Sequence, residues 1–169
     1  MVIWLLGHSG AGKSTIAGML AERLEAEGFL TISLDGDVVR AGMNRDLTFS
    51  DADRLENVRR VAELCKILLQ KEIIVICSFI TPMQAHRDQL RTMLGDRYME
   101  VYLDCPVSIC EQRDVKGLYQ KARNHEIEHF TGINSRFEIP ASPDLILHTS
   151  SSSPEQCAET VHSAVLQYL

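Results

Sequence analysis

The sequence predicts an α/β fold, a five-stranded parallel sheet with helices on both faces. Three observations favour it. Short apolar runs recur along the chain, each is followed by a longer segment whose apolar residues have helical spacing, and polar residues come directly after three of the runs. Strands buried on both faces read as continuous apolar runs, so this alternation is typical of a parallel sheet covered by two helical layers.

The apolar runs predict the strands, and the segments between them predict the helices. Gly28 is expected to end the first helix, because glycine readily adopts the left-handed conformation that closes a helix. The last helix is expected to begin with Ser153 as N-cap, Pro154 in its first position and Gln156 in its third, a variant of the capping box. Strands are expected at 2–6, 30–34, 73–79, 99–103 and 145–147, and helices at 13–27, 52–71, 84–94, 106–123 and 154–168.

The length and composition are those of an ordinary globular protein with one domain, residues 1–169. Hydrophobic residues make up 45% and charged residues 24% of the chain. No apolar run approaches the roughly 20 residues of a membrane span, and the net charge of −6 argues against a nucleic acid, whose binding depends on basic contacts. We therefore expect neither a membrane nor a nucleic acid as partner. Since no leader is visible before the first strand, we expect a cytoplasmic location.

The cysteines and histidines are scattered. No C-x-x-C pair and no histidine at zinc spacing occurs, which predicts reduced and mostly buried thiols at Cys65, Cys77, Cys105, Cys110 and Cys157. The six histidines have neither metal spacing nor a Ser or Cys partner arranged for nucleophilic attack. The sequence therefore supports no hydrolase triad.

The segment after the first apolar run fills every fixed position of a Walker A loop. It lies between a predicted strand and a predicted helix, the context in which backbone N–H groups turn inward around phosphates. Lys13 adds a positive charge, Ser14 offers a hydroxyl to Mg²⁺, and the positive end of the helix faces the anion. A chance glycine-rich turn is the alternative, which this combination disfavours. We predict a P-loop NTPase fold that binds a nucleoside triphosphate through Gly7, Ser9, Gly10, Ala11, Gly12, Lys13, Ser14 and Thr15.

Two carboxylates, Asp35 and Asp37, flank a glycine at the end of the second predicted strand, and Arg40 follows them. In such sheets ligands bind beyond the carboxyl ends of the strands, so both carboxylates can face the nucleotide. A carboxylate there can accept the proton of an attacking hydroxyl or hold Mg²⁺ through water. The alternative is that the Asp-Gly turn only caps the next helix.

Arg54 and Asn57 lie near the start of the helix expected at 52–71. They are three residues apart and hence share one face, which allows them to bind an anionic ligand together. Arg59 and Arg60 follow on the same helix. For these two, a solvated face with weak ion pairs is as good an interpretation as a function.

A basic segment at 113–123 and a polar loop at 125–142 lie between the fourth and fifth predicted strands. Mononucleotide kinases place a mobile lid there, whose Arg and Lys side chains approach the transferring phosphoryl group. We therefore expect a lid segment at residues 113–142, with Arg113 on the ATP. Phe49 and Phe130 are aromatic residues in polar loops and are suited to sandwiching a nucleobase, with local core packing as the alternative.

Taken together, seven blocks of the chain resemble the adenylylsulfate kinases, in order and at family spacing, from residue 1 to about 147. The blocks are Gly7-x-Ser9-Gly10-x-Gly12-Lys13-Ser14-Thr15, Asp35-Gly36-Asp37-x-x-Arg40, Asn44-Arg45-Asp46-Leu47-x-Phe49-Ser50, Asp53-Arg54-x-Glu56-Asn57-x-Arg59-Arg60, Ser78-Phe79-Ile80-x-Pro82, Lys116-Gly117-Leu118-Tyr119 and Phe130-Thr131-Gly132-Ile133.

The resemblance implies transfer of the γ-phosphate of ATP to the 3′-hydroxyl of adenosine 5′-phosphosulfate, with Mg²⁺ and usually as a homodimer. The catalytic positions carried over are Lys13, Asp35, Asp37 and Thr81, with Ser14 toward the metal. Phe49 and Phe130 are expected to clamp the base of the acceptor. The residues expected around that acceptor are Asp37, Arg40, Phe49, Arg54, Asn57, Ile80, Thr81, Lys116, His129 and Phe130.

The chain departs from the family pattern around the acceptor rather than around ATP. Thr81 stands where bacterial members can carry a phosphoserine, and Met83-Gln84 stands where Tyr-Arg is common. Other departures are Val38, Thr48, Asn124-His125 and Asn134-Ser135-Arg136. Two alternatives therefore stay open. One is a related kinase acting on another nucleotide such as cytidine diphosphoramidate. The other is a nucleotide-dependent switch, although no guanine-reading Asn-Lys-x-Asp motif occurs.

Overall fold

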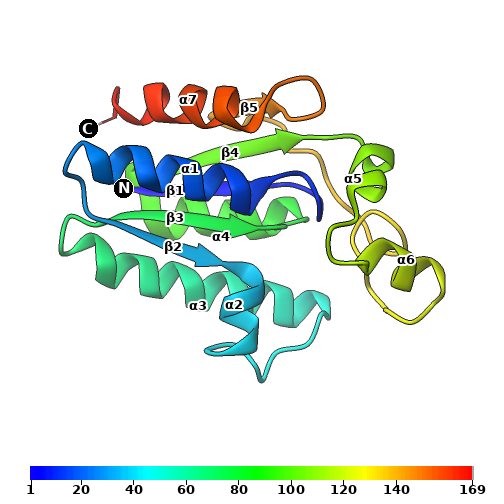
Figure 1. The fold of residues 1–169 in the computed structure, drawn as a ribbon. Coiled ribbons are helices and arrows are strands. Elements are labelled where there is room, and N and C mark those ends of the chain that lie inside the picture. Colours follow the sequence, from blue (N-terminus) through cyan, green and yellow to red (C-terminus); the bar gives the residue numbers. More distant parts are fainter. Residues whose placement is uncertain (169) are drawn as a thin grey trace.

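The computed structural model of the protein describes residues 1–168 and contains a five-stranded, all-parallel sheet. Its strand order is β2-β3-β1-β4-β5, so β1 lies at the centre and the chain moves outward in both directions (Figure 1). The register aligns Leu6 of β1 with Phe79 of β3 and Tyr102 of β4, which places their carboxyl ends at one edge. The strands are β1 Val2–Leu6, β2 Thr31–Asp35, β3 Ile74–Phe79, β4 Tyr98–Asp104 and β5 Leu145–His148.

Helices cover both faces of the sheet, as predicted (Figure 1). On one face α1 packs against α7, and on the other α3 packs against α4. Alternating residues of β1 supply both cores, with Ile3 and Leu5 in the α1/α7 layer and Trp4 in the α3/α4 layer. The helices are α1 Lys13–Ala26, α2 Gly36–Ala41, α3 Asp51–Leu69, α4 Gln84–Leu94, α5 Val107–Arg113, α6 Leu118–Arg123 and α7 Pro154–Val165, with a 3₁₀ turn η1 at Gly95–Arg97.

The expected end of α1 and the expected start of α7 are confirmed. Gly28 has φ +90° directly after the C-cap of α1. Ser153 and Gln156 form the complete capping box of α7, with Pro154 in the first turn. All five cysteines are free and buried, as expected for small apolar side chains.

The structure differs from the expected elements at two places. The single helix predicted at 106–123 is wrong, because the chain forms α5 and α6 with a break between them. Asp114 turns out of the helical conformation, Gly117 has φ +64°, and the Asp114 carboxylate accepts hydrogen bonds from the N–H groups of Tyr119 and Gln120. The short helix α2, which was not predicted, forms because the Asp35 side chain accepts a hydrogen bond from the backbone N–H of Asp37.

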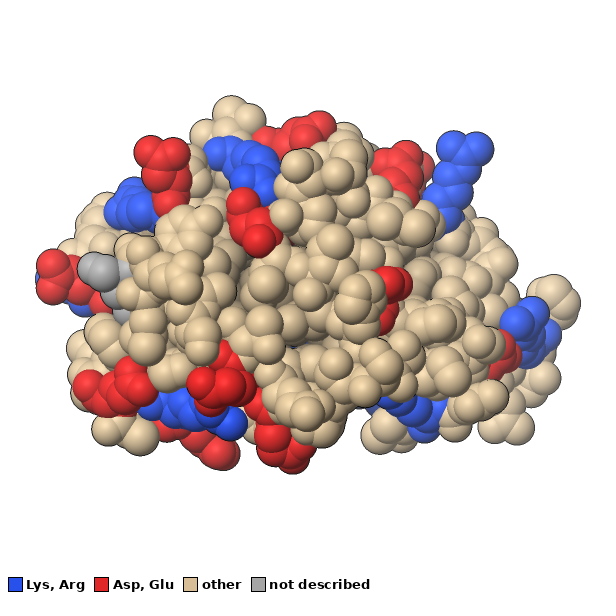
Figure 2. Space-filling model, turned by 90° about the horizontal axis from the view of Figure 1, so that it is seen from above, with Lys and Arg blue, Asp and Glu red and all other residues tan. Residues whose placement is uncertain are grey.

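Charged side chains lie mostly toward the rim of the face seen from the α7 side, with both signs interspersed (Figure 2). Within residues 1–168, no helix combines the length and the apolar character needed to cross a membrane.

Candidate active site

A cleft of about 1200 Å³ opens at the carboxyl end of the sheet. Its walls come from the loop after β1, from α2, from the loop after β3 and from residues 113–131 of the lid segment. Of the predicted site residues, all but Gly7 line it. At Gly7 a Cβ would lie 2.8 Å from the carbonyl oxygen of Leu103 on β4, so the packing of the loop against β4 requires glycine there. The structure thus brings into one cavity residues that the sequence separates by more than a hundred positions.

The loop between β1 and α1 is built for close approach by an anion. Gly10 and Gly12 have φ +78° and +98°, conformations that favour glycine. A Cβ on Gly10 would lie 2.8 Å from the carbonyl oxygen of Cys110, so α5 packs directly against the loop. Lys13 Nζ donates hydrogen bonds to the carbonyl oxygens of Gly7 (3.0 Å) and His8 (2.7 Å), which folds the side chain back over the loop. Burial lowers the pKa of Lys13 to about 8, although the carboxylates of Asp35 and Asp37 oppose the shift.

A hydroxyl and a carboxylate meet beside this loop. Ser14 Oγ donates a hydrogen bond to Asp35 Oδ2 at 2.6 Å, while Asp35 Oδ1 accepts from the N–H of Asp37. Burial disfavours the Asp35 carboxylate, yet these hydrogen bonds hold the pKa of Asp35 below its ordinary value. One Asp35 oxygen caps α2, as the structural alternative expects, and the other accepts from Ser14, while a role of Asp35 toward a ligand stays a prediction. Oxygen donors of this kind suit Mg²⁺, which takes one or two protein ligands and shares substrate phosphates.

Asp37 reaches across the mouth of the cleft to the lid segment. Its carboxylate, which is largely exposed, forms an ion pair with Lys116 Nζ. The hydrogen bond that Lys116 donates to Asp37 raises the pKa of Lys116. Because both partners are exposed, the pair contributes little to stability, and either group is free to turn toward a ligand.

Arg40 and Arg54 hold the loop that carries Phe49. The guanidinium of Arg40 lies 4.4 Å from the centre of the Phe49 ring and donates to the Thr48 carbonyl. Arg54 Nε donates to the Phe49 carbonyl at 2.9 Å, and its Nη2 donates to the His129 carbonyl at 2.6 Å. Arg54 therefore joins the start of α3 to the lid segment, a role that its spacing from Asn57 did not suggest.

The two aromatic residues expected to clamp a base differ in exposure. Phe49 is 51% exposed, whereas Phe130 is 8% exposed and packs edge-on against Tyr119 at 4.9 Å between ring centres. Both line the cleft. Phe130 therefore combines core packing with a position in the cleft wall, and the clamp stays a prediction.

Ile80 and Thr81 form part of the wall that follows β3. Thr81 is 4% exposed, has φ +44°, and its Oγ1 accepts a hydrogen bond of 2.7 Å from the indole Nε1 of Trp4. A positive φ strains a β-branched residue. The hydroxyl of Thr81 is thus held inside the protein.

Among the cleft residues that sequence reasoning did not assign to the site are three with informative contacts or burial: Tyr119, Thr149 and His86. Tyr119 Oη donates to the carbonyl of Ser9 at 2.9 Å, and the Thr149 carbonyl accepts from Arg113 at 2.7 Å. Arg113 also donates to the Gly10 carbonyl, so it connects the loop between β1 and α1, the predicted phosphate loop, to the residue that follows β5. The third, His86 on α4, is 3% exposed, and burial lowers its pKa to about 4. A lone histidine on an amphipathic helix carries no signal that would single it out.

Arg59 and Arg60 lie outside the cleft. They pair with Glu56, and Arg60 also pairs with Asp46, at distances of 2.7–2.9 Å. Both arginines therefore lie on a solvated helix face with ion pairs, the first of the two interpretations given for them.

Sequence comparison relates the chain to a known group of enzymes. The family model described as Adenylylsulphate kinase matches residues 1–148. The adenylyl-sulfate kinase of Clostridium kluyveri is 48% identical over 161 residues, which are 95% of this chain and 81% of that protein. A probable adenylyl-sulfate kinase of Bacillus subtilis is 48% identical over 169 residues, 99% of this chain and 86% of that protein.

Structural comparison agrees. The Mycobacterium tuberculosis APS kinase CysC, solved in complex with AMPPNP and APS, superposes with a TM-score of 0.94 at 40% identity and covers 98% of this chain and 96% of its own. Shikimate kinase from Acinetobacter baumannii, at 20% identity and a TM-score of 0.59, shares the fold over 98% of this chain and 93% of its own.

Proposed function

Because this chain belongs to the adenylylsulphate kinase family and is an ATP-dependent phosphotransferase with an alcohol group as acceptor, we propose that its cleft phosphorylates the 3′-hydroxyl of adenosine 5′-phosphosulfate. The observation that carries the proposal is the meeting of two half-sites in one cavity. The phosphate loop forms one end, and the loop carrying Phe49, the wall after β3 and the lid segment form the other. Such a cavity can hold a triphosphate and a nucleotide acceptor together.

ATP occupies the end formed by the phosphate loop. The backbone N–H groups from Ser9 to Thr15 and the ammonium of Lys13 surround its phosphates, and the first turn of α1 faces them. Arg113, anchored on the Gly10 and Thr149 carbonyls, borders the same end from the lid side. These groups stabilise charge that develops on the transferring phosphoryl group.

Ser14 Oγ and the Asp35 carboxylate, which are joined by a hydrogen bond of 2.6 Å, would hold Mg²⁺. The ion would supply positive charge beside the transferring phosphoryl group. The rest of the chemistry belongs to side chains of the chain itself.

The acceptor lies between Phe49 and Phe130, with Arg40, Arg54 and Asn57 on one side and Ile80, Thr81, Lys116 and His129 around it. Its 3′-oxygen attacks the γ-phosphorus, the bond from that phosphorus to the β–γ bridging oxygen breaks, and ADP leaves. Asp37 accepts the hydroxyl proton, because Asp35 is committed to Ser14 and to the start of α2. Lys116 then keeps Asp37 oriented toward the cleft.

The remaining parts of the proposal concern the whole protein. Residues 1–169 form one kinase domain, which acts as a homodimer in the cytoplasm. The single sheet that both cores share supports the single domain, and the family resemblance supports the dimer and the location. Light scattering on the purified chain measures the oligomeric state directly.

The acceptor is tested by a panel of nucleotides at fixed ATP and Mg²⁺, with ADP release followed by a coupled assay. We expect turnover with adenosine 5′-phosphosulfate and none above background with cytidine diphosphoramidate. Turnover with the cytidine compound alone would show that it, and not adenosine 5′-phosphosulfate, is the acceptor. Slow ATP hydrolysis without any phosphorylated acceptor would indicate a nucleotide-dependent switch.

A further inference from the structure

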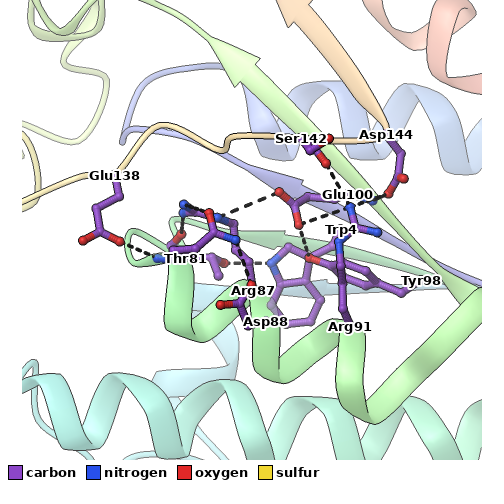
Figure 3. A network of polar contacts seen from close by, with 11 residues as sticks. Trp4, Thr81, Arg87, Asp88, Arg91, Tyr98, Glu100, Glu138, Ser142 and Asp144 are labelled. Carbon is purple, nitrogen blue, oxygen red and sulfur yellow. Dashed lines mark hydrogen bonds and ion pairs between the residues drawn. The ribbon is translucent and has the colours of Figure 1, made fainter.

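A buried polar network lies behind the acceptor wall, which we define as residues Ile80–Pro82. Its centre is Arg87 on α4, a fully buried guanidinium that does not line the cleft. Figure 3 shows Arg87 between Thr81 and Glu100, beneath the sheet. A buried charge is costly unless it is paired and hydrogen-bonded, so the partners of the Arg87 guanidinium indicate what it does in the fold.

Arg87 holds the backbone of the wall. Its Nη1 donates to the carbonyl oxygen of Thr81 at 3.1 Å, and its Nη2 donates to Gln84 Oε1 at 2.8 Å. The other polar group of Thr81, its hydroxyl, accepts from Trp4 at 2.7 Å. Two donors from different elements thus hold a residue whose positive φ is otherwise unfavourable.

Glu100 on β4 supplies the countercharge. It is 2% exposed, and its Oε1 lies 3.9 Å from Arg87 Nε. That Nε has no hydrogen-bond partner, so the contact is an ion pair without a direct hydrogen bond. Tyr98 Oη donates to Glu100 Oε2 at 3.3 Å, and Arg91 Nη2 lies 3.7 Å from the same oxygen. The Asp144 carboxylate accepts from the backbone N–H of Glu100 at 2.7 Å.

The lid segment is attached to the same wall. The backbone N–H of Glu138 donates to the Pro82 carbonyl at 2.8 Å, and the Glu138 carboxylate accepts from the first N–H of α4, that of Gln84, at 2.6 Å. The wall is therefore fixed by β1, by α4 and by the end of the lid segment. None of these contacts involves the phosphate loop.

We propose that Arg87, held by Glu100, is a positioning residue that keeps Thr81 in its strained conformation and so sets the acceptor wall for the incoming nucleotide. The proposal rests on the function proposed above. It assigns the Thr81 hydroxyl to the Trp4 hydrogen bond rather than to chemistry. Loss of Arg87 should therefore weaken acceptor binding and leave ATP binding unchanged.

The kinetic test compares Arg87→Met with Arg91→Met. The two arginines lie on the same helix and both reach Glu100, but only Arg87 contacts Thr81. We expect the acceptor KM of Arg87→Met to rise about tenfold, the KM for ATP to change less than twofold, and Arg91→Met to match the wild type. Arg87→Lys, which keeps the charge and one donor, should recover part of the loss. Unchanged acceptor KM in folded Arg87→Met would overturn the proposal.

A second readout does not depend on turnover. Trp4 is the only tryptophan in the chain, so its indole N–H gives one resonance in a ¹⁵N-labelled sample and reports on the bond to Thr81. We expect that resonance to shift in Arg87→Met and to stay in place in Arg91→Met. If the wild type uses a different acceptor, the proposed function fails while this shift still supports the positioning role. An unmoved resonance counts against it.

Stability is separated from positioning by a double variant. Replacing both members of a buried pair by apolar side chains is often neutral for stability, whereas removing one leaves an unpaired charge. If Arg87→Met does not fold, Arg87→Met/Glu100→Met provides the same kinetic comparison, and Trp4→Phe removes the other donor. A raised acceptor KM in these folded variants supports the proposal, and a wild-type KM in both refutes it.

Discussion

At the scale of single residues, burial in the cleft disfavours the charged form of several side chains. Lys13 is the clearest case, since burial lowers its pKa to about 8 while its ammonium donates to two backbone carbonyls. A triphosphate brings negative charge that favours the ammonium form. The charge on Lys13 and the occupancy of the loop are therefore linked.

The linkage predicts that ATP affinity falls as pH rises. Above about pH 8 the free enzyme carries a neutral Lys13, and only the charged fraction binds well, so the apparent Kd should increase about tenfold between pH 7 and pH 9. Calorimetry at several pH values measures this, with proton uptake on binding as a second sign. Lys13→Arg is the control, because its charge persists over this range. An equal pH slope in both proteins would contradict the linkage.

At the scale of secondary-structure elements, short segments decide the geometry of the site. The phosphate loop touches α5 through Gly10, and the Asp114–Gly117 break directs α6 so that Tyr119 reaches the Ser9 carbonyl. The chain thus supports its phosphate loop from the lid side. A continuous helix over 106–123 would lack the Asp114–Gly117 break that brings Tyr119 to the Ser9 carbonyl.

Gly10→Ala should weaken nucleotide binding. Its Cβ would lie 2.8 Å from a backbone oxygen at φ +78°, and backbone strain of this kind costs roughly 1–3 kcal/mol, so we expect the Kd for ATP to rise at least about fivefold. Isothermal titration measures it. Gly18→Ala on α1 is the matched control: nothing lies within 4 Å of its Cβ, and alanine should stabilise the helix. Wild-type affinity in Gly10→Ala would show that the loop tolerates a side chain.

At the scale of the whole molecule, the α3/α4 side of the fold buries a cluster of ionisable groups. Arg54, His86, Arg87 and Glu100 are each at most 9% exposed. His86 lies near two of these arginines, which add to the effect of burial and keep it neutral. Acid should therefore destabilise the fold through this side.

The free energy of unfolding should fall as pH drops from about 6.5 toward 4. In that window the unfolded chain protonates the histidine while the folded chain keeps it neutral, which amounts to about 2 kcal/mol at pH 5 relative to neutral pH. Urea unfolding at pH 5 and pH 7.5 measures the difference. His86→Gln should reduce this pH dependence, and His125→Asn, at an exposed position, should not. Equal pH dependence in wild type and His86→Gln would refute the assignment.

The sequence by itself determined the parallel sheet and the phosphate loop, and every predicted site residue except Gly7 lines the cleft, because apolar runs, glycine spacing and helix caps are local signals. Only the tertiary structure decided how those residues are held. Trp4 meets Thr81 across 77 positions, Arg54 meets His129 across 75, and the pairing of Arg87 with Glu100 depends on α4 packing under β4. Such contacts follow from the packing of whole elements, and no periodicity along the chain encodes them.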